Sequence, residues 1–144
     1  MKENLLGYML GSEFLILIDR SILIPLEANK SSPVQFRPTM FRLLIYLIEN
    51  ASIEPVHDDD IMRNVWEIHG LRASKPRLWQ VMNNMGKKMG LKEGISELFL
   101  RIENTGYLVN KDNIKYIYVR EFPNELMGDY IPKGTLIERS NYSQ

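Results

Sequence analysis

The segment from Arg72 to Lys92 constrains the fold more than any other part of this chain, because it combines a regular apolar stripe with an acid-free surface. Four apolar side chains recur at i, i+4, i+7 and i+11, with Val81 beside them: Leu78, Met82, Met85 and Met89. This spacing is typical of one amphipathic helix whose apolar side faces a core. The segment also contains six Lys and Arg residues and no Asp or Glu. We therefore predict a helix over residues 74–89 with a positively charged outer surface.

The outer surface of this helix combines cations with carboxamide side chains. Cations attract phosphates regardless of base sequence, whereas Asn and Gln amides can donate and accept hydrogen bonds at one base edge, that of adenine in particular. A helix with this surface is suited to the major groove of double-stranded DNA. The candidate base-reading residues are Gln80, Asn83 and Asn84, and the candidate phosphate-binding residues are Lys75, Arg77, Lys87 and Lys88.

The alternative interpretation is a solvated helix whose lysines keep the protein soluble, because charged runs usually mark a water-facing surface. The chain as a whole has 18 basic and 18 acidic residues. Six of the basic residues lie in this segment. The rest of the chain therefore contains 12 basic residues and all 18 acidic residues. Positive charge is therefore concentrated in the segment, and the context of the helix must decide between the two interpretations.

Composition narrows the class of protein. At 144 residues, with 44% hydrophobic and 25% charged residues, the chain suits one globular domain with an appendage. The absence of cysteine excludes a disulfide framework, thiolate metal sites and a Cys nucleophile, and it fits a reducing cytoplasm. The apolar runs are far shorter than the ~20 residues of a membrane helix, and no secretory signal is recognisable. We expect a cytoplasmic protein, either free or tethered to the inner membrane through a segment beyond residue 144.

Short runs of β-forming residues open the chain. Residues 14–19 and 22–26 flank the polar pair at 20–21 and predict a hairpin, with Pro25 at a sheet edge or a strand end. A third short strand is predicted at 34–36. Pro38 suits the first turn of a helix, because its missing N–H costs nothing there. The wide apolar face that follows predicts the most buried helix of the chain: Met40, Phe41, Leu44, Leu47 and Ile48.

A second helix is predicted after a loop at 51–56. The three aspartates at 58–60 are expected to complement its dipole and cap its free N–H groups, instead of forming a metal or catalytic cluster. Trp66 is expected in the core, and Gly70 is expected to end the helix.

The third helix is followed by a predicted hairpin. Ser74 can cap this helix, and Pro76 falls in its first turn. Residues 98–102 and 107–109 are β-forming runs around a turn that contains Asn and Gly. The sequence therefore predicts an α+β fold over residues 1–110, with an N-terminal antiparallel sheet, three helices and a C-terminal hairpin. Residues 111–144 are expected to be an extension or linker, with one added strand at 114–119.

Four segments agree in order and spacing with one family. They are residues 36–44 (FRPTMFRLL), 59–66 (DDIMRNVW), 78–89 (LWQVMNNMGKKM) and 102–109 (IENTGYLV). They resemble the first helix, the second helix, the recognition helix and the wing of the winged helix-turn-helix DNA-binding domain of OmpR/PhoB-type regulators. The resemblance covers residues 8–110. Strands that begin close to residue 1, with no receiver domain before them, are more similar to the ToxR/CadC-like branch of that family.

The resemblance transfers DNA contacts only where residues match the family's pattern. It places the three carboxamide residues at base-facing positions, and Thr105 in the wing turn joins the candidate DNA contacts. Gly86 and Pro76 stand where the family often has arginine, and Glu103 replaces the wing arginine. A carboxylate facing phosphates is unfavourable, so DNA binding is expected to depend on the helix more than on the wing.

We expect a sequence-specific DNA-binding transcriptional regulator that works as a homodimer or with a partner regulator. The alternative is a winged helix that contacts RNA polymerase or a partner regulator. Four features favour this alternative: the neutral net charge, Gly86, Glu103, and the position of Trp79 outside the apolar stripe. Trp79 is expected to pack against the helix edge. The alternatives are that it contacts a thymine methyl group or a protein partner.

An enzyme is not expected. The chain has no phosphate-binding Gly loop, catalytic triad or metal-ligand spacing. His57 and His69 are its two histidines, and neither has a nucleophile or second ligand at a telling spacing. No cofactor or metal is therefore expected.

Overall fold

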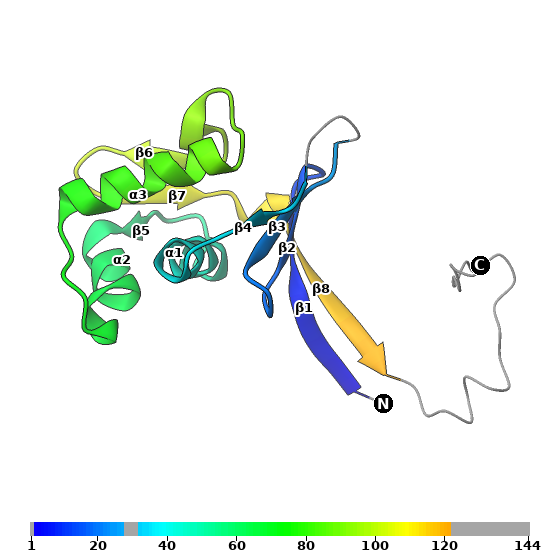
Figure 1. The fold of residues 1–144 in the computed structure, drawn as a ribbon. Helices are drawn as coiled ribbons and strands as arrows, with labels where there is room; N and C mark the ends of the chain where they lie inside the picture. The colour runs from blue at the N-terminus through cyan, green and yellow to red at the C-terminus, as the bar shows by residue number, and fades with distance from the viewer. Residues whose placement is uncertain (1, 28–31, 122–144) are drawn as a thin grey trace, which may run out of the picture. The chain divides into compact units, whose positions relative to one another are not determined.

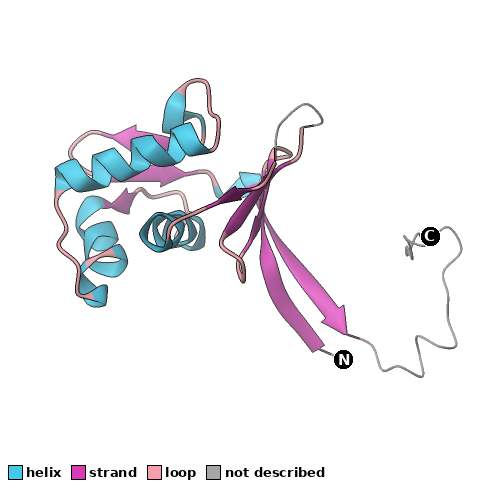
Figure 2. Cartoon of the chain, viewed as in Figure 1, coloured by secondary structure: helices cyan, strands magenta, loops and turns pink. Residues whose placement is uncertain are grey.

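The computed structural model describes residues 2–27 and 32–121 of the chain (Figure 1). The strands are β1 (Lys2–Leu10), β2 (Phe14–Leu17), β3 (Ile22–Pro25), β4 (Val34–Gln35), β5 (Val56–His57), β6 (Phe99–Ile102), β7 (Gly106–Val109) and β8 (Ile114–Glu121). The α-helices are α1 (Pro38–Glu49), α2 (Asp58–Val65) and α3 (Lys75–Lys88), and three short 3-10 helices are η1 (Glu67–His69), η2 (Gly94–Glu97) and η3 (Lys111–Asn113). Figure 2 marks the helices, strands and loops of the chain by colour.

These residues form two compact units. The larger unit spans residues 6–117 and contains every described helix, the two predicted hairpins and the candidate site. The described part of the other unit consists of residues 2–5 and 118–121, the outer ends of β1 and β8. The rest of the predicted extension, residues 122–144, lies outside the described residues.

The first sheet has five strands in the order β4-β3-β2-β1-β8. The predicted hairpin is confirmed: β2 and β3 are antiparallel, and Pro25, the last residue of β3, lies opposite Phe14. Gly7 of β1 pairs with Leu17. A Cβ at Gly7 would lie 1.8 Å from the carbonyl oxygen of Ile16, so only glycine allows this approach of the two strands.

The sequence pattern does not predict β1. Residues 2–10 lack a strict apolar–polar alternation, and strand formation there is supported by hydrogen bonding to β2 on one side and β8 on the other. The strand predicted at 114–119 is confirmed as β8. It continues this sheet, and the backbone N–H of Gly11 donates to the carbonyl oxygen of Asn113 just before it.

The core of the larger unit is centred on α1. Leu43, Leu44 and Leu47 are fully buried, which confirms that this helix supplies much of the interior. Polar contacts also tie α1 to its neighbours on both sides. Tyr8 Oη of β1 donates to Glu49 Oε2 (3.1 Å), and Arg42 Nη1 donates to the carbonyl oxygen of Val65 at the end of α2 (2.9 Å). The helix therefore connects the first sheet to the helix-turn-helix.

The second helix ends earlier than the sequence predicts. Its α-helical part stops at Val65, and η1 follows before Gly70 adopts a left-handed conformation (φ +77°). Trp66, between the two helices, is buried as predicted. Gly70 is therefore the end of the 3-10 turn, where its missing Cβ permits a positive φ.

The second sheet has the order β5-β7-β6 and contains the predicted C-terminal hairpin. Val56 was expected in a loop but forms β5 with His57, pairing with Tyr107 and Gly106 of β7. A two-residue strand carries no periodicity that a sequence pattern could reveal. Gly106 permits the pairing, because a Cβ there would lie 1.9 Å from the carbonyl oxygen of Val56.

Candidate nucleic-acid interface

The predicted recognition helix is present as α3, and its start is capped as expected. Ser74 Oγ accepts a hydrogen bond from the backbone N–H of Arg77 (3.1 Å), and Pro76 lies in the first turn. The apolar stripe is confirmed, since four residues expose 4% of their surface or less: Leu78, Met82, Met85 and Met89. The opposite side of α3 is therefore the side available to a partner.

The candidate residues on α3 lie on its accessible side. All are exposed except Asn83, which is half-buried: Lys75, Arg77, Gln80, Asn84, Lys87 and Lys88. A hollow of about 310 Å³ brings four of them together, namely Gln80, Asn83, Asn84 and Lys87. Three carboxamides and one cation thus converge on a single concave surface that can form hydrogen bonds to a base edge.

Gly86 has a packing role. It is buried, and a Cβ there would lie 2.8 Å from the backbone nitrogen of Ile95 in η2. Backbone atoms cannot move aside as a flexible side chain would, so this position of α3 requires glycine. The departure from the family's arginine therefore reflects close contact between α3 and the η2 turn.

Trp79 does not pack as expected. It is 64% exposed on the side of α3 that faces the hairpin. At 3.6 residues per turn, position 79 lies about a quarter turn from the buried stripe, so most of the side chain stays accessible. Trp79 is thus an exposed aromatic group beside the candidate base-reading residues.

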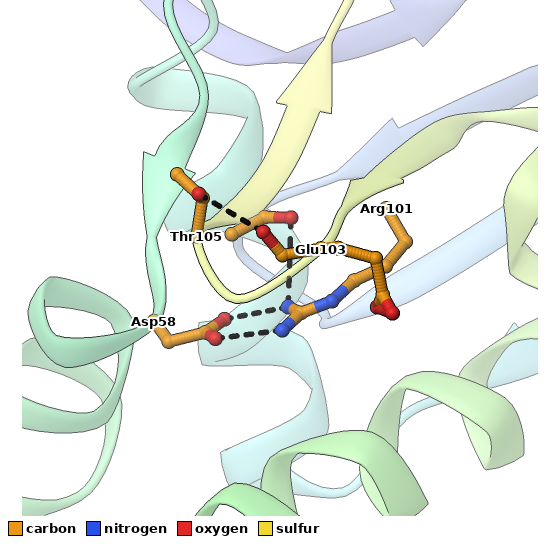
Figure 3. Close-up of polar contacts among 5 residues, drawn as sticks. Asp58, Arg101, Glu103 and Thr105 are labelled. Atoms are coloured by element: carbon orange, nitrogen blue, oxygen red, sulfur yellow. Dashed lines mark hydrogen bonds and ion pairs between the residues drawn. The ribbon is translucent and has the colours of Figure 1, made fainter.

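The wing turn between β6 and β7 is organised by its own backbone. Thr105 Oγ1 donates to the carbonyl oxygen of Glu103 (3.1 Å), and Asn104 adopts a left-handed conformation (φ +57°). Figure 3 shows this contact next to Arg101. The hydroxyl proton of Thr105 is therefore used inside the turn, and the exposed Glu103 presents a negative charge.

An ion pair that the sequence does not reveal joins the wing to α2. Arg101 of β6 donates to both carboxylate oxygens of Asp58, at 2.7 and 2.8 Å (Figure 3). The Asp58 side chain is 5% exposed, so the predicted cap of α2 is instead the buried partner of a wing arginine. The hydrogen bond to Asp58 raises the pKa of Arg101 above its ordinary value. The guanidinium also lies 4.9 Å from the ring centre of Tyr107, and burial raises the pKa of that phenol.

A second concave surface lies on the side of α3 that faces α1. We call it the α1-side hollow; its volume is about 600 Å³. Four cations line it: Arg37, Arg72, Arg77 and Lys88. Arg37 and Arg72 were not among the predicted site residues, because they lie before α1 and between α2 and α3, outside the periodic pattern of the recognition helix. None of the described residues that line this hollow is acidic.

The opposite side of α3 carries what we call the wing-side hollow, of about 320 Å³. Its charged residues are Lys75 and Arg101 against Asp58 and Glu103. These charges cancel, and the exposed ring of Trp79 lies among them. The recognition helix is therefore flanked by a strongly basic surface on one side and a neutral surface on the other.

Within the described residues, no group of three or more His, Asp or Glu side chains has a geometry that could hold a metal ion. In the same part of the chain, no helix combines the length and apolar character needed to cross a bilayer.

The helices, the hairpin and the N-terminal antiparallel sheet form a winged helix-turn-helix fold in which α3 is exposed. No family model matches the sequence, and no curated protein sequence matches it either. Among solved structures, the chain is similar to the DNA-binding domain of Escherichia coli CadC, with a TM-score of 0.60 and 14% identity over 81% of this chain and 100% of that one.

Two further solved structures were determined with DNA. The AdeR response-regulator DNA-binding domain, in complex with an intercistronic region, gives a TM-score of 0.53 at 12% identity over 68% of this chain and 94% of that one. The Klebsiella pneumoniae RstA DNA-binding domain, in complex with the RstA box, gives a TM-score of 0.53 at 17% identity over 71% of this chain and 94% of that one. At such low identity these likenesses establish the fold, and the residue roles must be argued from this chain.

Proposed function

We propose that this chain is a sequence-specific DNA-binding transcriptional regulator that inserts α3 into the major groove. The observation that carries the proposal is the exposed, acid-free side of α3, where Gln80, Asn83 and Asn84 converge on one concave surface. In this role the three carboxamides read base edges. The residues that hold phosphates on α3 are Lys75, Arg77, Lys87 and Lys88.

The fold supports the proposal independently of these residues. CadC, AdeR and RstA share this fold as DNA-binding domains, two of them in complexes with DNA. Thr105 is a further contact in the proposal, through an oxygen lone pair or its methyl group, since its proton is donated within the turn. The wing contributes less than α3, because Glu103 faces outward there.

The test is selection of bound sequences from random duplex DNA, followed by the same selection with Asn84→Ala. A regulator of this kind enriches a defined site, and loss of one base reader changes the preference at one position. Uniform weakening without a changed preference would make Asn84 a positioning residue. If the native protein retains no duplex even at low salt, the proposal is wrong.

The second candidate function is contact with a protein, either RNA polymerase or a partner regulator. Exposed apolar groups favour it: Trp79 and Ile68 are each 64% exposed, and Leu71 is 43% exposed. The double variant K87A/K88A separates the two candidates, because it removes phosphate-binding charge without altering these apolar groups. Unchanged regulatory activity in that variant would support protein contact.

The wider organisation follows from the same proposal. A single winged helix presents a small contact surface, so we place it in a homodimer or beside a partner regulator on paired half-sites. We assign residues 1–110 to the DNA-binding domain and 111–144 to an extension, and we place the protein in the cytoplasm, free or tethered through a segment outside this chain. Measuring the oligomeric state with and without the selected duplex tests whether the protein binds DNA as a dimer.

A further inference from the structure

We infer that the α1-side hollow holds the phosphate backbone of one DNA strand, and that Arg37 and Arg72 bind it together with Arg77 and Lys88. This inference rests on the proposed function and extends it to residues outside the recognition helix. It also predicts that α3 is held mainly from one side of the groove.

The charge of the hollow is the first support. Four cations from three different parts of the chain line it, and none of its described lining residues is acidic. None of the four forms an ion pair with another described residue, whereas Arg63 is paired with Asp60 and Arg101 with Asp58. Their charge is therefore not cancelled locally, and it attracts an anion such as a phosphate.

The shape of the hollow is the second support. Arg37 precedes α1 with no side-chain cap at that helix terminus, and Arg72 lies in the turn between η1 and α3. An apolar floor separates the cations, formed by Met40, Trp66, Leu71 and Val81. Four cations spread around a floor of this kind suit an extended chain of phosphates and sugars better than one small anion.

The wing-side hollow supplies the contrast. There Arg101 is engaged by Asp58, and Lys75 lines the same hollow as the acidic Glu103. The major groove has a phosphate backbone on each wall, so the two sides of α3 meet similar negative charge with unequal positive charge. The strand that faces α1 is therefore gripped more strongly than the strand that faces the wing.

The experiment compares R37A/R72A with R20A/K115A, a matched control that removes two exposed cations from the first sheet. Binding to a labelled duplex is measured against salt concentration. Each lost phosphate contact lowers the slope of log K against log salt by about 0.9, so R37A/R72A should lose about 1.8 in slope and bind roughly 50-fold more weakly at about 0.1 M salt. The control should retain the native slope.

Two additions make the result decisive. Circular dichroism checks that R37A/R72A is folded, and R37K/R72K, which preserves charge, should keep most of the slope. Duplexes with single methylphosphonate substitutions should show interference mainly on one strand of the contact region. If the native protein binds DNA with a salt-dependent slope but R37A/R72A matches its control, or if both strands interfere equally, this inference fails while the proposed function stands. If the native protein binds no duplex, the proposed function fails.

Discussion

The two sides of α3 differ in how their charges are used. On the side facing α1, Arg77 and Lys88 join Arg37 and Arg72 without any acidic neighbour among the described lining residues. On the side facing the wing, a buried carboxylate holds the arginine and a second carboxylate is exposed. The side facing α1 therefore carries positive charge without a local counterion, whereas on the other side Asp58 and Arg101 pair to hold the wing against α2.

Among changes at the residues around α3, the largest effect is expected from breaking the ion pair on the wing side. Arg101→Ala leaves the Asp58 carboxylate buried without a partner and should reduce the free energy of unfolding by about 2–3 kcal/mol, a value reduced for the partial exposure of Arg101. Chemical denaturation measures the change. Arg63→Ala, which removes the exposed pair with Asp60, is the control and should cost about 0.5 kcal/mol or less. Equal losses in the two variants would show that burial of Asp58 has no energetic consequence.

The contact between α3 and η2 gives the next largest effect. In Gly86→Ala the new Cβ meets the backbone of Ile95 at 2.8 Å, so the free energy of unfolding should fall by about 1–2 kcal/mol, although alanine is the better helix former. Asn84→Ala, at an exposed position of the same helix, should change stability by about 0.5 kcal/mol or less. A stabilised Gly86→Ala protein, seen in the same denaturation experiment, would contradict the tight packing of this turn.

Charge on the wing side is tested with Glu103→Gln. If the wing lies against DNA as proposed, removing this exposed carboxylate should strengthen duplex binding about two- to tenfold at low salt, with a smaller gain as salt rises. Fluorescence anisotropy at two salt concentrations measures this. Glu54→Gln, an equal change of charge at an exposed position in the loop before β5, is the control. An equal gain in both variants would assign the effect to net charge and not to the wing.

The smallest effect is expected at the exposed Trp79, and the buried Trp66 is the comparison for it. Trp79→Ala should leave the free energy of unfolding within about 0.5 kcal/mol of the native value, because the ring is 64% exposed. Trp66→Ala, at 3% exposure, should cost about 3–5 kcal/mol in the same denaturation experiment. If Trp79→Ala destabilises the protein like a core substitution, the ring is covered in solution. A stable variant that loses DNA binding would instead place Trp79 at the interface.

The elements with strong local signals could be predicted. The methionine stripe predicted the position of α3, Pro38 predicted the start of α1, and Ser74 predicted the cap of α3. These signals concern residues within a few positions of one another, and helix periodicity and capping depend on such local geometry. Strand β1 was missed because its residues lack apolar–polar alternation, although it pairs with the adjacent strand β2. The two-residue strand β5 was missed because it carries no periodicity and its partner β7 lies far along the chain.

The candidate site divides in the same way. The carboxamides and cations of α3 were predictable because they share one helix, and all but the half-buried Asn83 are exposed. Their roles toward DNA stay predictions. Arg37 could not be recognised, because nothing near it in the sequence indicates that it lies beside Arg77 and Lys88. Arg72 belongs to the acid-free segment, but it precedes the periodic pattern of the helix, so its place beside them was not predicted.

What the sequence determined by itself is the amphipathic character of α3, since the spacing of apolar residues fixes which side of a helix can be buried. What only the tertiary structure decided is how charge is distributed around that helix. Asp58 and Arg101 are 43 residues apart and meet only because β5 and β6 both pair with β7. Electrostatic interactions depend on distance in space, and the fold sets that distance for residues far apart in the chain.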